Sequence, residues 1–185
     1  FKIAARKGER ILIRCQAKSL DSRLDPAMTL FDSSGRELQT DRDAAGHDLV
    51  LDLRAPADGD YFVKLHDFVY SGGGEYFYRL TASTRPYVDF VWPPVVVAGR
   101  RQAHTLFGRN LPGSAAAEGL AIEGQPLEQA PVTIDVPVGA AADPLAALLR
   151  PRSPAAFLDL LPYRLRTPQG DSNQTPLALG RGDVV

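Results

Sequence analysis

Apolar and polar residues alternate along much of the first half of the chain, with the period of two that is typical of half-buried β-strands. In the segment 10–17, Ile11, Ile13 and Cys15 share one face of the expected strand. In the segment 47–53, leucines occupy every second position, at Leu49, Leu51 and Leu53. Further strands are expected, between turn-forming residues, at 28–31, 61–65 and 76–80. Short strands with frequent turns and no helical period predict a β-sandwich.

The second half also has extended character but contains more proline. The strands expected there are 88–97, 103–107, 132–136, 163–166 and 176–179. Pro93 and Pro94 fall inside the first of these, which suits an edge strand or a bulge because proline cannot donate to a ladder. One short helix is predicted in a loop, with Asp143 as its N-cap and Pro151 as its stop.

A change in composition places a domain boundary near residue 85. Of the 15 prolines, 13 lie at Pro86 or later, whereas all four lysines lie before it. The residue before a proline is restricted to extended geometry, which suits a short link. We therefore expect an all-β chain of two β-sandwich domains in tandem, residues 1–84 and residues 85–185, with the one short helix in the second.

Charge and cysteine usage exclude several classes of protein. The 21 basic and 22 acidic residues give a net charge of −1, so there is no basic excess to attract a nucleic acid. No apolar run approaches the roughly 18–20 residues of a membrane-spanning helix. Cys15 is the single cysteine, which leaves no intrachain disulfide and predicts a small buried hydrophobe.

No motif of a known catalytic chemistry is present, so we expect no catalytic residues and no resident cofactor. The sequence contains no Gly-x-Ser-x-Gly elbow, no His-Glu-x-x-His and no phosphate-binding loop. The three histidines, His47, His66 and His104, lie in or beside expected strands. The alternative, a catalytic domain, would need a concave pocket that holds a histidine within hydrogen-bond reach of a nucleophile.

Two groups of residues are candidates for binding. Asp41, Asp43 and Asp48 offer hard oxygen ligands at short spacing, as calcium requires, and a solvated acidic loop is the alternative. Tyr70 and Phe77 flank a glycine-rich loop, where outward-facing rings would stack on a sugar or a peptide. Packing in the core or between strands is the alternative for these aromatic residues.

Several segments resemble known bacterial families. The segments ARKGERILIRCQA, LDPAMTLFDSSGREL, HDLVLDLRAPADGDYFVKLHD and GGGEYFYRLT resemble the pre-peptidase C-terminal domain in order and spacing, over residues 1–84. The segment PYVDFVWPPVVVAGRRQAHTLFGRNLPGS resembles the opening of an immunoglobulin-like TIG/IPT domain. In that segment the recurring positions are Gly99, Gly108, Asn110 and Leu111.

The resemblance implies a jelly-roll-like sandwich followed by an immunoglobulin-like one, in a fragment of a large exported bacterial protein. It implies a non-catalytic structural or interaction module at the cell surface or outside the cell, such as an accessory segment of a peptidase. The partners expected are the parent protein's other domains, and a polysaccharide or protein. Two alternatives stay open: a calcium-dependent polysaccharide- or protein-binding module, and an export or maturation segment that proteolysis removes.

Overall fold

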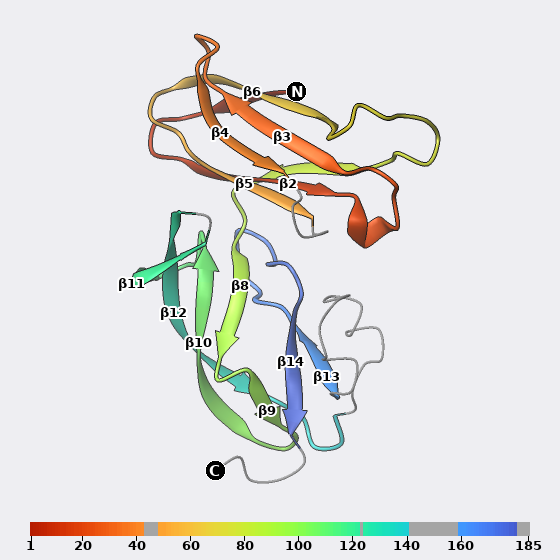
Figure 1. The fold of residues 1–185 in the computed structure, drawn as a ribbon. Helices are drawn as coiled ribbons and strands as arrows, with labels where there is room; N and C mark the ends of the chain where they lie inside the picture. The colour runs from red at the N-terminus through yellow and green to blue at the C-terminus, as the bar shows by residue number, and fades with distance from the viewer. Residues whose placement is uncertain (43–47, 123, 141–158, 181–185) are drawn as a thin grey trace. The chain divides into compact units, whose positions relative to one another are not determined.

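A computed structural model describes residues 1–42, 48–122, 124–140 and 159–180. The chain divides into two compact units, residues 1–84 and residues 85–185. Among the described residues, strands make up nearly all of the regular structure, and the one helical element is a single 3₁₀ turn at Lys18–Leu20 (Figure 1). The fold class predicted from the sequence, an all-β chain with β-sandwiches in tandem, is confirmed.

Unit 1 consists of two antiparallel sheets. Its strands are β1 (Lys2–Ala5), β2 (Arg10–Gln16), β3 (Pro26–Phe31), β4 (Glu37–Arg42), β5 (Leu49–Arg54), β6 (Gly59–Asp67) and β7 (Arg79–Ser83). The first sheet has the strand order β1-β6-β3-β4, and the second has the order β5-β2-β7. Strands that are distant in sequence therefore become neighbours, as β1 and β6 do.

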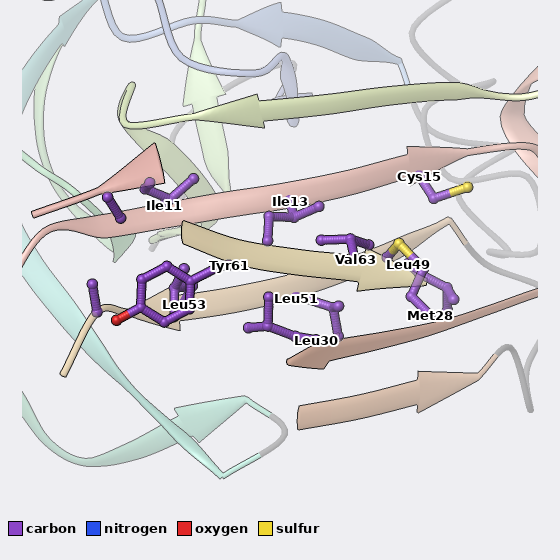
Figure 2. Close-up of a cluster of buried hydrophobic side chains, with 12 residues drawn as sticks. Ile11, Ile13, Cys15, Met28, Leu30, Leu49, Leu51, Leu53, Tyr61 and Val63 are labelled. Carbon is purple, nitrogen blue, oxygen red and sulfur yellow. The ribbon is translucent and has the colours of Figure 1, made fainter. Parts of the chain in front are cut away.

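The core of unit 1 lies between the inward faces of these sheets (Figure 2). Ile13 of β2, Met28 of β3 and Leu51 of β5 are completely buried. The alternating leucines of β5 all face this core, as their period of two predicts. Cys15 is also part of the core and has no exposed surface, as predicted.

Unit 2 also consists of two sheets. Its strands are β8 (Tyr87–Trp92), β9 (Val95–Val97), β10 (Arg101–Arg109), β11 (Ala115–Ile122), β12 (Gln125–Asp135), β13 (Leu160–Tyr163) and β14 (Thr175–Gly180). The sheet orders are β11-β12-β10-β8 and β13-β14-β9. The β9–β14 pair is parallel, whereas the other strand pairs of the described residues are antiparallel. The core of this unit contains Val96, Leu106 and Leu177.

The chain changes sheets at Pro93 and Pro94. These residues separate β8 from β9, and each of the two strands is an edge strand of its own sheet. The Trp92–Pro93 peptide bond is cis. The side chain of Asn173 then occupies part of the free edge of β8: its Oδ1 accepts from the Val88 N–H at 2.8 Å, and its Nδ2 donates to the Val88 carbonyl at 2.9 Å. An amide side chain thus replaces a backbone partner of β8.

Gly108 marks a bulge in β10. The register with β8 shifts between Phe107 and Gly108, and a Cβ atom at position 108 would lie 2.0 Å from the carbonyl oxygen of Tyr87. Glycine is required here by the close approach of two backbones. Two residues further on, Asn110 takes a positive φ of 54°, which asparagine tolerates better than most residues. These positions explain the spacing of glycine, asparagine and leucine seen in the sequence.

Some elements differ from the sequence-based expectation. The strand expected at 76–80 begins only at Arg79, because a turn closed by the Tyr76 N–H and the Gly73 carbonyl occupies the preceding residues. The strand expected at 163–166 lies at Leu160–Tyr163. No strand was expected at β4 or β11, because these two edge strands lack a clear alternation of apolar residues. The helix predicted after Asp143 lies outside the described residues.

Candidate functional site

The outer face of the sheet β1-β6-β3-β4 brings together side chains from three strands. In β3, Met28 points into the core, so its neighbour Ala27 points to the outer face. Ala27 lies opposite His66 of β6 on one side and opposite Arg42 of β4 on the other. Figure 1 shows β3 between these two strands. Opposite residues on antiparallel strands project from the same face, so His66 and Arg42 flank the small Ala27 side chain.

A second row of polar side chains lies next to this one on the same face. Thr29 of β3 is opposite Lys64 of β6 and Thr40 of β4. The Thr40 hydroxyl donates to the Thr29 hydroxyl at 2.9 Å, and both Thr40 and Lys64 are exposed. This row therefore offers two hydroxyl groups and one ammonium group to solvent.

The turn that follows β6 is organised by the carboxylate of Asp67. Its Oδ1 accepts from the backbone N–H groups of Val69 and Ser71, at 3.2 and 2.8 Å, and its Oδ2 accepts from the Asp25 N–H at 3.0 Å. Burial alone would raise the pKa of Asp67, but these three backbone donors outweigh it and hold the pKa below its ordinary value. The ionised carboxylate therefore fixes the path of this turn.

The turn folds two aromatic rings back onto the sheet. The Tyr70 ring stacks on the His66 ring, with the centroids 4.7 Å apart and the planes 6° from parallel. The Arg42 guanidinium lies over the Phe68 ring, 5.3 Å from its centroid. Because His66 and Arg42 flank Ala27, both rings gather at the same end of the outer face. We call His66, Phe68, Tyr70 and Arg42 the β6 platform.

Tyr70 is held in an uncommon backbone conformation. Its φ is +59°, in the left-handed region, which costs a non-glycine residue about 1 kcal/mol or more. The Tyr70 N–H donates to the Asp67 carbonyl at 2.9 Å, and this bond together with the Asp67 carboxylate maintains the turn. The side chain nevertheless remains 75% exposed. An exposed ring in a fixed position is suited to contact a ligand with its open face.

The hydrogen bonding of His66 defines its tautomer. Its Nδ1 lies 2.9 Å from the Asp67 carbonyl oxygen, which can only accept, so Nδ1 carries the proton. In the neutral ring the lone pair is then on Nε2. The platform thus combines an aromatic surface with a hydrogen-bond acceptor at its edge.

The structure separates the two aromatic residues singled out from the sequence. Tyr70 belongs to the β6 platform, whereas Phe77, 48% exposed, lies just before β7. Within the described part of the chain, no ring contact joins them. Neither Arg42 nor His66 was expected from the sequence to be part of a binding surface. Their approach depends on the register of β3 with β4 and β6, which the sequence does not specify.

The three aspartates considered for calcium have different surroundings. Asp48 caps a turn: its Oδ1 accepts from the N–H groups of Ala17 and Ser19, at 3.0 and 3.2 Å. Asp41 lies in β4 opposite Met28, and Asp43 lies outside the described residues. Among the residues that are described, no group of three or more metal-ligating side chains comes together. Calcium binding by this segment stays a prediction.

Cys15 and His104, which were considered for nucleophilic or acid–base chemistry, are both buried. Burial, and then the charge of Asp48, raise the pKa of Cys15 to about 12, so its thiol stays protonated. His104 is buried in β10, and its Nδ1 lies 2.8 Å from the Pro93 carbonyl oxygen. His47 lies outside the described residues.

In the described ranges, none of the helical structure is long and apolar enough to cross a membrane.

Comparison with known proteins connects part of the chain to a peptidase. A segment of 66 residues is 33% identical to part of a probable subtilase-type serine protease of Deinococcus radiodurans. The match covers 35% of this chain and 9% of that protease. No protein-family profile matches the chain. The similarity is therefore to a small part of a much longer protein.

Proposed function

We propose that this chain is a non-catalytic interaction segment of an exported peptidase. The observation that carries the proposal is the 66-residue similarity to a probable subtilase-type serine protease, of which the match covers only 9%. A segment of this size suits an accessory domain attached to a larger enzyme. The tandem β-sandwich fold agrees with this role, because each unit has its own core and presents sheet faces to solvent.

The surroundings of the reactive side chains support a binding role over a chemical one. The Cys15 thiol has no exposed surface, and its pKa of about 12 keeps it protonated. His66 uses Nδ1 for a backbone carbonyl and its ring face for Tyr70. Phe68 and Tyr70, in contrast, are two exposed aromatic residues on one turn of unit 1. The side chains best placed to act on another molecule are therefore those that bind by contact.

Export and attachment to further domains are part of the same proposal. A peptidase that works outside the cell meets insoluble or polymeric substrates, and a binding segment would keep the catalytic domain close to them. The partners proposed are the other domains of the parent protein and a polymer outside the cell.

The proposal is tested with the purified chain. We expect no hydrolysis of casein and no labelling by a fluorophosphonate probe, with subtilisin as the positive control. The chain should also be retained on at least one insoluble polymer, either a protein matrix or a polysaccharide. Casein hydrolysis that copurifies with the chain and is abolished by the probe would overturn the non-catalytic role. Failure to bind any polymer would overturn the interaction role.

Calcium dependence is a separate prediction with its own test. A ligand that binds only the folded state adds RT ln(1 + [L]/Kd), about 2.7 kcal/mol at a hundredfold excess over Kd. If the segment with Asp41, Asp43 and Asp48 binds calcium, the melting temperature should be higher in millimolar calcium than in chelator. The Asp43→Ala variant should remove the difference. Equal melting temperatures for the wild type in both buffers would contradict calcium binding.

A further inference from the structure

We propose that the outer face of the sheet β1-β6-β3-β4 binds a neutral polysaccharide, with the ring of Tyr70 as the stacking surface. This inference rests on the proposed interaction role and assigns that role a ligand class and a site. It depends on the β6 platform and on the neighbouring row of Lys64, Thr29 and Thr40.

The aromatic surface of Tyr70 has a shape that suits a sugar ring. One face of the Tyr70 ring is covered by His66, in a nearly parallel stack, and the side chain is still 75% exposed. The uncovered surface is therefore a flat ring in a fixed orientation. A sugar ring has an apolar face of C–H groups, which can pack against an aromatic face as another ring does. Because the stack and the Asp67 turn already fix Tyr70, little conformational freedom is lost on binding.

Hydrogen-bonding side chains lie beside the Tyr70 ring. The Nε2 atom of neutral His66 can accept a hydrogen bond from a sugar hydroxyl, because its Nδ1 proton is donated to the Asp67 carbonyl. The hydroxyls of Thr29 and Thr40 both donate and accept, and the Lys64 ammonium donates. A ligand that presents a flat apolar face and a rim of hydroxyl groups matches this combination.

The charge of this surface also bears on the class of ligand. The charged side chains nearest the turn are paired: Lys18 with Asp25, and Arg23 with Glu75 at 2.7 Å. The Asp67 carboxylate is occupied by backbone donors, and the Arg42 guanidinium lies over Phe68. Arg42 and Lys64 are two positive charges and Asp67 is one negative charge, so the excess on this surface is small, which favours a neutral polymer over an anionic one.

The orientation of the rings also argues against a membrane. A loop that inserts into a bilayer projects its apolar side chains away from the protein, whereas the rings of Phe68 and Tyr70 lie against Arg42 and His66. A flat surface on a sheet suits a polymer that lies along the protein. This surface also extends beyond the platform, because Phe62 is 41% exposed on the same face of β6. Phe62 lies four positions before His66, a distance of about 13 Å along the strand.

The experiment measures depletion of the purified chain from solution by insoluble cellulose, chitin and curdlan. We expect saturable binding to at least one of them, and at least tenfold weaker binding by Tyr70→Ala. Tyr70→Phe should bind like the wild type, because it keeps the ring. Trp92→Ala removes another exposed aromatic residue, this one from unit 2, and should leave binding unchanged. Circular dichroism and thermal melting establish that each variant is folded.

Casein-agarose, gelatin-agarose and liposomes with anionic lipids are tested in parallel. Retention on a protein matrix or on liposomes without retention on any polysaccharide would overturn this inference. Retention on a protein matrix would leave the proposed interaction role standing. Equal binding of Tyr70→Ala and wild type to a polysaccharide would also overturn the assignment of the site to Tyr70, because the ligand would then lie elsewhere. Soluble oligosaccharides should compete, and longer ones should compete better if the ligand reaches Phe62.

Discussion

Replacing Gly108 by alanine tests the close approach of β8 and β10 in unit 2. The new Cβ atom would lie 2.0 Å from the Tyr87 carbonyl oxygen and 3.1 Å from the Val88 Cα, although real Cβ contacts under 3.0 Å are essentially never seen. Relief therefore requires a movement of about 1 Å between two hydrogen-bonded backbones. Overpacking of this kind costs about 1–3 kcal/mol. For a unit of this size we expect a melting temperature lower by about 5–20 °C.

The assay is differential scanning calorimetry together with the fluorescence of Trp92, the one tryptophan of the chain, which lies in unit 2. The matched control is Gly74→Ala, where the added Cβ meets no atom within 4 Å. That control should change the free energy of unfolding by no more than about 0.5 kcal/mol. If Gly108→Ala melts at the same temperature as the wild type, the bulge and the register of β8 with β10 are wrong.

Three further predictions concern unit 1. The Leu51→Ala variant should lower the free energy of unfolding by about 2–5 kcal/mol in urea titrations, because a completely buried side chain is removed from the core; a change under about 1 kcal/mol would contradict that packing. The Cys15 thiol, with a pKa of about 12, should react with Ellman's reagent only as fast as the protein unfolds, and rapid modification of the native protein would contradict its burial. Because the pKa of Asp67 is lowered in the folded state, its carboxylate stabilises the protein at pH values above the pKa of an unfolded aspartate, about 3.9. This stabilisation is lost as the pH falls through the lower pKa of the folded state. Urea titrations from about pH 6 to pH 2 should therefore show a smaller acid-induced loss of stability for Asp67→Asn than for the wild type, and equal losses would contradict this role.

The core of unit 1 could be predicted from the sequence because burial on one face of a strand imposes a period of two. Leu49, Leu51 and Leu53 follow this period, and all three are buried. The edge position of the expected strand 88–97 could also be predicted, because Pro93 and Pro94 cannot donate to a ladder, whereas its division into β8 and β9 was not expected. Both features depend on residues that are close together in the sequence.

The candidate binding surface could be predicted only in part, because it depends on contacts between distant residues. Tyr70 was identified from its position near a glycine-rich loop, but its partner His66 could not be. The stack requires a turn fixed by the Asp67 carboxylate and a positive φ at Tyr70, and neither leaves a pattern in the sequence. Arg42 joins the surface through the register of β4 with β3. A polar edge strand gives no periodic signal from which to derive that register.

The role proposed for this chain is to contribute binding and not chemistry. The most direct measurement incubates the purified chain with an insoluble polymer and follows two quantities in the same tube. These are the fraction of chain that sediments with the polymer, and the soluble peptide or sugar that is released. We predict saturable sedimentation with at least one polymer and no release above a blank. Release of product in proportion to the amount of chain added would contradict the proposed role.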